Sequence, residues 1–412
     1  MKCTAFSFSH IPFLLSEIDE HSSVYLELLR LAHFRKHTSS LIECGEGVNI
    51  IVGNNGQGKT NILEAISFLA VTKSFLNASD GTVLQRGADV FEIEGKMNAD
   101  SNMQSTVRIA YRASTAEKIF TINKKNITPR SAVIGKYPIV ILSPEHAGIT
   151  FGAPGERRTF MDFVLSQSSQ VYLNDILACR RVIKQRNAML SDAKRERRSV
   201  DESISSWNEQ LALYGAKVMK QREQFIATFQ EYVNATYRNI IAGAEEPTLA
   251  YTPQVAFQRD TTEEEIAALI HKKIEKEFPR ESSAGTTLVG PHHDEVELRI
   301  NGFDLRKFAS QGQHKTFLIA LKIAEFHYLA SRCNETPILL LDDMFAELDD
   351  TRAAHVLDIV RTCGQTFVTC TNANVFDAVL EYNGKHKKIV VEEWNCSSPF
   401  WEPNSITSNI SE

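Results

Sequence analysis

The residues with the clearest chemical meaning form a glycine-rich octapeptide near the N-terminus. Residues 53–60 match the pattern G-x-x-x-x-G-K-[ST] in full, and they are Gly53, Asn54, Asn55, Gly56, Gln57, Gly58, Lys59 and Thr60. Glycines let the backbone turn its N–H groups toward phosphate oxygens, Lys59 supplies charge for the β- and γ-phosphates, and the Thr60 hydroxyl can ligate Mg²⁺. The octapeptide therefore predicts ATP and Mg²⁺ as cofactors, with a chance glycine-rich turn as the alternative.

The flanking residues predict the strand and helix that such a loop requires. Residues 48–52, Val-Asn-Ile-Ile-Val, form a short β-branched run typical of a buried parallel strand. After the loop, Ile62, Leu63, Ile66 and Leu69 recur at helical spacing and predict one apolar face. A helix that begins here would point its positive N-terminal end at the phosphates. These flanks favour a phosphate-binding loop over a chance turn.

A second candidate segment lies near the other end of the chain, where residues 338–343 read Ile-Leu-Leu-Leu-Asp-Asp. Aliphatic residues ending in two carboxylates are typical of a buried strand whose C-terminal end meets a nucleotide, although solvated acids after a strand are the alternative. We expect Asp342 to hold Mg²⁺ and Asp343 to orient or deprotonate the attacking water, with Glu347-Leu348-Asp349 forming a turn beside the site. Together with Lys59, these acids are the predicted catalytic residues. One ATP site would then be assembled from segments about 280 residues apart.

A third segment contains Ser310, Gln311 and Gly312 and precedes a long apolar helix, which is predicted from Thr316 to about Ser331. A serine that begins a helix and is followed by glycine can bind an anion through backbone N–H groups. An ordinary helix cap with a flexible glycine is the alternative.

Taken together, the three segments resemble ABC-type ATPase heads. Within that group the sequence is similar to the RecF family of bacterial recombination mediators, which are related to SMC heads. The similarity covers nearly the whole chain from residue 24 onward. It is carried by further segments, which are Phe34-Arg35, Lys73-Ser74-Phe75, Leu142-Ser143-Pro144-Glu145-His146, Gly155-Glu156-Arg157-Arg158 with Phe160-Met161-Asp162, and Val289-Gly290-Pro291-His292-His293-Asp294.

The resemblance implies an α/β fold: a P-loop ABC-type ATPase head with an inserted helical lobe shaped as a short coiled-coil hairpin. Such heads form ATP-dependent homodimers, so Ser310, Gln311 and Gly312 are expected to reach the γ-phosphate in trans and Arg35 to lie near the phosphates in cis. Family members bind DNA with ATP, hydrolyse ATP slowly, and act with RecO and RecR to load RecA at single-strand gaps. The implied function is an ATP-driven DNA clamp of replication and gap repair, with a weak DNA-stimulated ATPase as its switch.

Some positions depart from the transporter pattern within this group. The signature reads Ser-Gln-Gly-Gln, Asp343 stands where a longer glutamate is usual, and Cys370-Thr371 stands where transporters have a switch histidine. These departures predict slow turnover. Many relatives have Arg after Lys73-Ser74-Phe75, whereas this chain has Leu76, which puts any contact made there in doubt.

The middle of the chain predicts a helical hairpin. Ile204, Leu211, Val218, Phe225 and Tyr232 share one heptad position, and we expect two antiparallel helices joined by a tip near 191–202. At ~1.5 Å per residue the arm would be roughly 40–50 Å long. A further helix is expected from Thr262 to about Phe278. The predicted domains are an N-terminal appendage (1–23), the P-loop part of the head (24–165), the helical lobe (166–284), the signature part of the head (285–390) and a polar tail (391–412).

Basic residues concentrate on this lobe and predict contact with DNA phosphates. The candidates are Arg180, Arg181, Lys184, Lys194, Arg195, Arg197 and Arg198, in a cluster that also includes Arg157, Arg158 and Arg186. A solvated helical face is the alternative, because Asp192, Glu196, Asp201 and Glu202 dilute the charge.

Composition narrows the remaining classes. The net charge of -6 over 412 residues gives no whole-molecule argument for nucleic-acid binding, so that case depends on local patches. The 7 cysteines include no C-x-x-C pair, which favours a reducing, cytoplasmic location. No apolar run reaches the ~18 residues of a membrane span. A transporter subunit is disfavoured because Ser310 lies about 250 residues after Lys59. An SMC-like head or ABC-type ATPase that handles DNA ends stays as the alternative.

Overall fold

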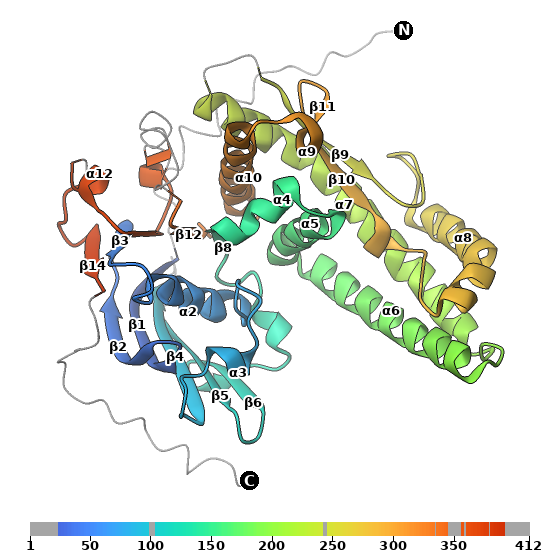
Figure 1. The fold of residues 1–412 in the computed structure, drawn as a ribbon, viewed down its shortest axis with the longest axis horizontal. Helices are drawn as coiled ribbons and strands as arrows, with labels where there is room; N and C mark the ends of the chain where they lie inside the picture. Colours follow the sequence, from blue (N-terminus) through green and yellow to red (C-terminus); the bar gives the residue numbers. More distant parts are fainter. Residues whose placement is uncertain are drawn as a thin grey trace.

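The computed structural model describes residues 24–391, apart from 99–103, 242–244, 334, 345–355, 358–359 and 379. The expected appendage at 1–23, the Glu347-Leu348-Asp349 turn and the tail after Val391 lie outside these residues. The described chain forms an α/β head and a helical lobe that extends away from it (Figure 1). Within the described ranges, no helix combines the length and the apolar character needed to cross a membrane.

A parallel sheet of five strands forms the centre of the head, in the order β14-β3-β13-β12-β8. The bounds are β3 Val48–Val52, β8 Ile139–Leu142, β12 Ile338–Asp342, β13 Thr366–Cys370 and β14 Lys387–Val390. The strands predicted at 48–52 and 338–343 are confirmed, the latter one residue shorter. Successive residues of β3, β8 and β12 enter two different cores, one on each face of the sheet. Burial of both faces explains why these strands read as unbroken aliphatic runs.

One face of this sheet is covered by α2 (Lys59–Val71), which also contacts an antiparallel sheet of six strands in the order β2-β1-β4-β5-β6-β7. Those strands are β1 Tyr25–Phe34, β2 His37–Glu43, β4 Val90–Asn98, β5 Gln104–Arg112, β6 Glu117–Ile122 and β7 Lys125–Asn126. The predicted apolar face of α2 is buried, and so are Ala65 and Phe68 outside it. The helix is therefore held between two sheets, and the loop before it is fixed in place.

The other face of the parallel sheet packs against α10 (Gln311–Arg332) and the helical lobe. The lobe contains α5 Pro154–Ser168, α6 Gln170–Glu196, α7 Ile204–Ile240 and α8 Glu263–Ala284. The predicted antiparallel hairpin is α6 and α7, and 27 residues make α6 about 40 Å long. The tip is shorter than expected, because α6 continues through 191–196.

Short elements connect the two parts, and three strands form a further sheet in the order β11-β10-β9. The bounds are α3 Asp80–Val83, η1 Arg130–Val133, η2 Pro144–Ala147, α4 Gly148–Phe151, β9 Pro247–Thr252, η3 Pro291–His293, β10 Glu295–Ile300, β11 Phe303–Asp304, α9 Leu305–Phe308, α10 Gln311–Arg332 and α12 Asn374–Asp377. The helix predicted from Thr316 begins one turn earlier, so Ser310 is its cap.

The predicted end of α8 at Phe278 was wrong, because the helix runs through Pro279 to Ala284. A proline inside a helix removes one backbone hydrogen bond. The last turn is held instead by Glu281, whose fully buried carboxylate forms an ion pair of 2.8 Å with Arg186. Arg186 is itself fully buried and also donates to Asn208 and Thr287. Its inclusion in the basic surface cluster was therefore wrong as well.

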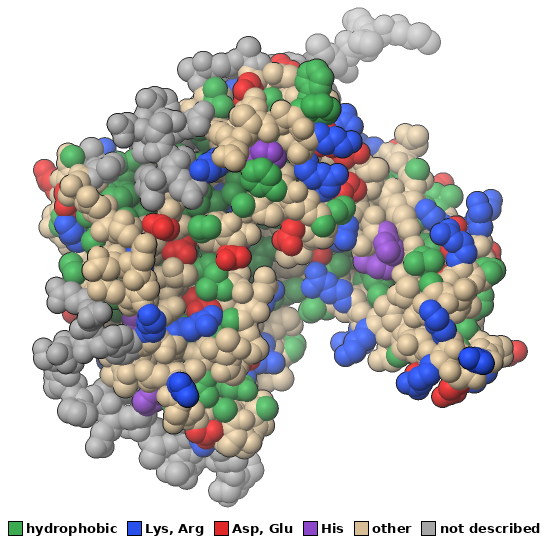
Figure 2. Space-filling view, in the orientation of Figure 1, with side chains coloured by type: hydrophobic (Ala, Val, Ile, Leu, Met, Phe, Trp, Pro, Cys, Tyr) green, Lys and Arg blue, Asp and Glu red, His purple; other side chains and the backbone are tan. Residues whose placement is uncertain are grey.

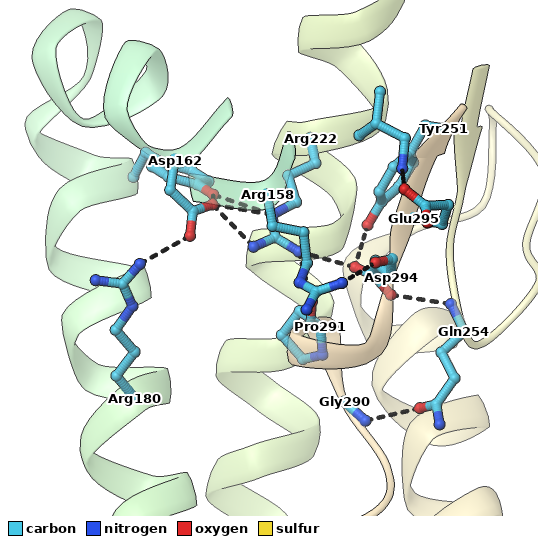
Figure 3. Close-up of polar contacts among 12 residues, drawn as sticks. Arg158, Asp162, Arg180, Arg222, Tyr251, Gln254, Gly290, Pro291, Asp294 and Glu295 are labelled. Carbon is cyan, nitrogen blue, oxygen red and sulfur yellow. Dashed lines mark hydrogen bonds and ion pairs between the residues drawn. The ribbon is translucent and has the colours of Figure 1, made fainter. Parts of the chain in front are cut away.

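Two of the sequence segments that carried the family resemblance meet at a buried ion-pair network (Figure 3). The Arg222 guanidinium lies between Asp162 of α5, at 2.8 Å, and Asp294 after η3, at 3.0 Å. The Tyr251 hydroxyl donates to the same Asp294 carboxylate at 2.5 Å. Arg158 donates to the Asp294 carbonyl. The network ties α5, α7 and β10 into one body.

The same network changes the interpretation of two basic residues. Arg157 is buried and forms an ion pair of 2.9 Å with Glu295. Arg158, half-buried, points into the lobe toward Asp294 (Figure 3). Both therefore act within the protein, and their place in the exposed basic cluster was wrong.

We expect Arg222→Met to lower the free energy of unfolding by about 3–5 kcal/mol, because it leaves two carboxylates buried without their cation. The matched control is Arg180→Met. Arg180 pairs with the same Asp162, but its side chain is 59% exposed, so its loss should cost less than about 1 kcal/mol. Urea denaturation followed by circular dichroism measures both. Equal effects would contradict the role given to burial.

Candidate nucleotide-binding site

The glycine-rich loop joins the C-terminal end of β3 to the first residue of α2. Gly56 and Gly58 have φ values of 80° and 100°, a left-handed conformation that favours glycine. Gly58 precedes α2 and provides no side-chain cap, so no cap side chain occupies the first N–H groups of the helix. A β-carbon on Gly53 would lie 2.6 Å from the carbonyl oxygen of Val391. The loop therefore has the backbone freedom and the N–H donors that phosphate binding needs.

A cavity of about 320 Å³ opens over this loop. Its lining contains both predicted motifs: Lys36, Asn55, Gly56, Gly58, Lys59, Thr60, Asn61, Asp342, Asp343 and Thr369. The Lys59 ammonium donates to the carbonyl oxygens of Gly53 and Asn54 at 2.8 and 3.1 Å, so it lies across the loop. Gln57 also belongs to the loop, and its side-chain oxygen accepts a hydrogen bond from the Asn54 N–H at 2.5 Å.

The contact between the two motifs is a hydrogen bond. The Thr60 hydroxyl lies 2.9 and 3.0 Å from the two carboxylate oxygens of Asp342, although 282 residues separate them in sequence. The Thr369 hydroxyl donates to the same carboxylate at 2.7 Å. Burial raises the pKa of Asp342 above its ordinary value, and the neighbouring carboxylate of Asp343 raises it further. The carboxylate is therefore held in a place where its charge is costly unless a cation joins it.

The oxygen atoms at this point suit a hard divalent cation. A hydroxyl and a carboxylate are donors that Mg²⁺ accepts. The Asp343 Oδ1 atom is buried and has no hydrogen-bond partner in the described part of the chain, which leaves it available to a ligand or water. Asp343 has a φ of 52°, so the chain turns at the end of β12 and brings this second acid to the cavity.

Arg35, predicted to lie near the phosphates, forms two hydrogen bonds of 2.7 Å with the fully buried Glu64. Ser74 also donates to Glu64, which explains the Lys73-Ser74-Phe75 segment as a support for α2. Arg35 is not among the residues that line the cavity. Its neighbour Lys36 is, and its ammonium donates to the Gly56 carbonyl. The sequence analysis missed Lys36, although its place beside Arg35 was a signal.

The signature segment does not reach its own P-loop cavity. Ser310 accepts a hydrogen bond from the Gln313 N–H, and the Gln313 side chain accepts one from the Ser310 N–H, so together they cap α10. Ser310 and Gln311 are exposed and Gly312 is half-buried. None of the three lines the cavity over the P-loop. A contact between this segment and a nucleotide therefore requires a second copy of the chain, and it stays a prediction.

The seven basic residues predicted to contact DNA are all exposed on α6 or its tip, where Lys and Arg side chains gather (Figure 2). Several have partners: Arg180 pairs with Asp162, Arg195 with Asp192 and Arg198 with Glu196, and Lys194 donates to the Ala284 carbonyl. The side chains of Arg181, Lys184 and Arg197 have no ion pair or hydrogen bond with any residue that the structure describes. Those three are the charges best placed for an external anion.

Comparison with known proteins identifies the family. The family model of the RecF/RecN/SMC N terminal domain matches residues 25–388. The DNA replication and repair protein RecF of Chloroherpeton thalassium is 39% identical over 357 residues, which are 86% of this chain and 96% of that protein. This chain belongs to the RecF family. The RecF of Salinibacter ruber is similar too, at 37% identity over 86% of this chain and 87% of its own.

Two solved structures of RecF have the same fold. The recombination mediator protein RecF-ATP, in the RecFOR pathway, superposes with a TM-score of 0.78 at 28% identity and covers 86% of this chain and 95% of its own. RecF-ATPrS from the same pathway gives a TM-score of 0.81 at 27% identity, over 89% of this chain and 98% of its own. The predicted ABC-type head with an inserted helical lobe is therefore confirmed as the fold class.

We expect Asp342→Asn to raise the Tm of the protein without ligand by a few degrees at neutral pH. The substitution removes a buried charge, while the amide oxygen can still accept from Thr60 and Thr369. Differential scanning calorimetry measures the effect. The control, Asp260→Asn, removes an exposed carboxylate and should leave the Tm unchanged. A lower Tm for Asp342→Asn would show that the cavity stabilises the charge by itself.

Proposed function

We propose that this chain is an ATP- and Mg²⁺-dependent DNA-binding protein of replication and recombinational gap repair that acts in the cytoplasm. The observation that carries the proposal is the contact of Thr60 with Asp342 inside the P-loop cavity. Membership of the RecF family and the likeness to RecF-ATP support the nucleotide and the biological role. The two solved RecF structures belong to proteins of the RecFOR pathway. RecO and RecR are therefore the proposed partners of this chain, and RecA is a proposed indirect partner.

The residues of one chain divide the work of holding the nucleotide. The loop from Gly53 to Gly58 cradles the phosphates with its N–H groups, and Lys59 moves from its carbonyl partners to the β- and γ-phosphates. Lys36 supplies a second cation beside Gly56 of the loop. Thr60 and Asp342 would hold Mg²⁺, which neutralises phosphate charge when it is bound. Asp343 orients a water molecule through its unpartnered oxygen.

Closure of the site needs the signature segment of a second copy. Gln311 and Gly312 present backbone N–H groups at the start of α10, beside the Ser310 hydroxyl, where the helix end favours an anion. ATP between two copies therefore bridges them, and DNA is clamped while the bridge lasts. Asp343 is shorter than the usual glutamate, so hydrolysis is slow and serves as a weak, DNA-stimulated switch that releases the clamp.

Nucleotide binding and pairing are separated by two substitutions. Lys59→Ala should prevent nucleotide binding and pairing together, because the phosphates lose their main cation. Ser310→Arg should leave binding by the monomer intact and abolish pairing, because a large side chain blocks the exposed cap. Fluorescence polarisation with a labelled ATP analogue measures the first property, and light scattering in ATP and Mg²⁺ measures the second. Pairing by Lys59→Ala at the parental ATP concentration would overturn the proposal.

For DNA, the triple substitution of Arg181, Lys184 and Arg197 by Ala should weaken binding and lower the slope of log K against log salt. Each phosphate contact contributes about 0.9 to that slope for duplex DNA. The control is Arg195→Ala with Arg198→Ala, since both charges are already paired with neighbouring acids. Anisotropy with duplex and gapped DNA at several salt concentrations measures both. Equal slopes in the triple variant and the parent would exclude α6 as the DNA contact.

A further inference from the structure

Two phenylalanines beside the signature segment are unusually exposed. Phe303 of β11 and Phe308 of α9 are 64% and 69% exposed, and their ring centroids lie 6.0 Å apart in an edge-to-face arrangement. An exposed aromatic pair of this kind indicates a surface that another molecule covers. Its position in the chain says which molecule to consider, because Phe308 precedes Ser310 by two residues.

The link between Phe308 and the signature is extended. α9 ends at Phe308, and Ala309 and Ser310 both have extended backbone conformations, with ψ values of 144° and 162°. Two extended residues span about 7 Å. A group held at the Ser310 end of α10 therefore has its remote parts within reach of the Phe308 ring. When Ser310 contacts the terminal phosphate of a nucleotide, the base is the remote part.

The P-loop cavity supplies nothing on which a base could stack. Its described lining consists of glycine and of Lys, Asn, Thr and Asp side chains, without an aromatic ring. A purine that is held by the phosphates alone would leave both of its faces exposed. Stacking on aromatic side chains is the usual way in which proteins hold a base without regard to its sequence.

Charges around the pair suit an anionic ligand. Arg306 and Lys307 lie between the two phenylalanines in sequence, and both line a groove of about 470 Å³ beside α9. They form no ion pair with the residues that the structure describes. By contrast, Arg157 and Arg299 in the same groove are paired with Glu295 and Glu297. Of the basic residues in this groove, Arg306 and Lys307 are therefore the two without an ion pair among the described residues, and they are also the two nearest in sequence to Phe303 and Phe308.

From these observations we propose that Phe308, supported by Phe303, stacks on the purine base of the nucleotide bound in the P-loop of a second copy of this chain. The inference rests on the proposed function and extends it. Each composite site then takes its P-loop contacts from one copy, and its signature and base contacts from the other. The aromatic pair makes pairing selective for a nucleotide over a bare polyphosphate.

The first experiment compares ATP with inorganic tripolyphosphate as the agent that pairs the chains, in Mg²⁺, by light scattering. In the parent, ATP should pair the chains at lower concentration than tripolyphosphate. Phe308→Leu keeps an apolar side chain without a ring, and it should raise the half-saturating ATP concentration about tenfold while leaving that of tripolyphosphate unchanged. Phe308→Trp should restore the response to ATP. The control, Val171→Ala, alters a side chain 66% exposed at the start of α6 and should behave as the parent.

A mixture of two variants tests whether the ring acts across the pair. A chain with Phe308→Leu has an intact P-loop, and a chain with Lys59→Ala has an intact ring, so their heterodimer contains one complete composite site. Fluorescence energy transfer between differently labelled chains should show pairing at lower ATP concentration than Phe308→Leu alone requires. If the ring served its own P-loop, no site in the mixture would be complete and no gain would appear.

The outcomes separate this inference from the proposed function. Equal weakening by Phe308→Leu with ATP and with tripolyphosphate would mean that the ring contacts protein, and the base assignment would be overturned. Parental behaviour of Phe308→Leu would overturn it as well. Both results are compatible with loss of pairing in Lys59→Ala, which tests the nucleotide site itself. Unchanged Tm values confirm that the exposed substitutions leave the fold intact.

Discussion

The hydrogen bond between Thr60 and Asp342 is the constraint on which the arrangement of the head depends. It joins the first turn of α2 to the end of β12, and it forms only if β13 lies between β3 and β12 in the sheet. Thr369 of β13 donates to the same carboxylate, so α2, β12 and β13 all meet at the Asp342 side chain. The long insertion between the two motifs is tolerated because the sheet, and not the sequence, brings them together.

Burial at this meeting point has opposite consequences for stability and for ligand binding. Burial disfavours the charged form of Asp342 and raises its pKa, even though Thr60 and Thr369 donate to the carboxylate. The neighbouring Asp343 has a buried oxygen without a partner in the described part of the chain. A cation that enters the cavity relieves both. Cation binding here would also stabilise the fold, because a ligand that binds only the folded chain favours it.

The sequence predicted the elements that physical patterns specify locally. The aliphatic runs of β3 and β12 and the heptads of α7 placed those elements correctly, since burial on defined faces leaves a period in the sequence. The fate of individual charges was harder to predict. Arg186 and Arg157 look like surface cations in a basic stretch, and their partners Glu281 and Glu295 lie far along the chain. The role of Arg35 was also hard to predict, because its partner Glu64 is a buried residue of α2. The sequence of that helix indicated only an apolar face.

Consecutive elements carry the two halves of the proposed composite site. α9 holds Phe308, α10 begins at Ser310, and the strand that follows α10 ends at Asp342. α10 is buried along most of its length against α7, α5 and β8, and its internal pair Lys322–Glu325 is also buried. A helix so tightly packed moves as a rigid body. In the proposed pair of chains, Ser310 at the start of α10 would serve the nucleotide of the partner, while Asp342 at the end of the next strand would serve the nucleotide of its own chain.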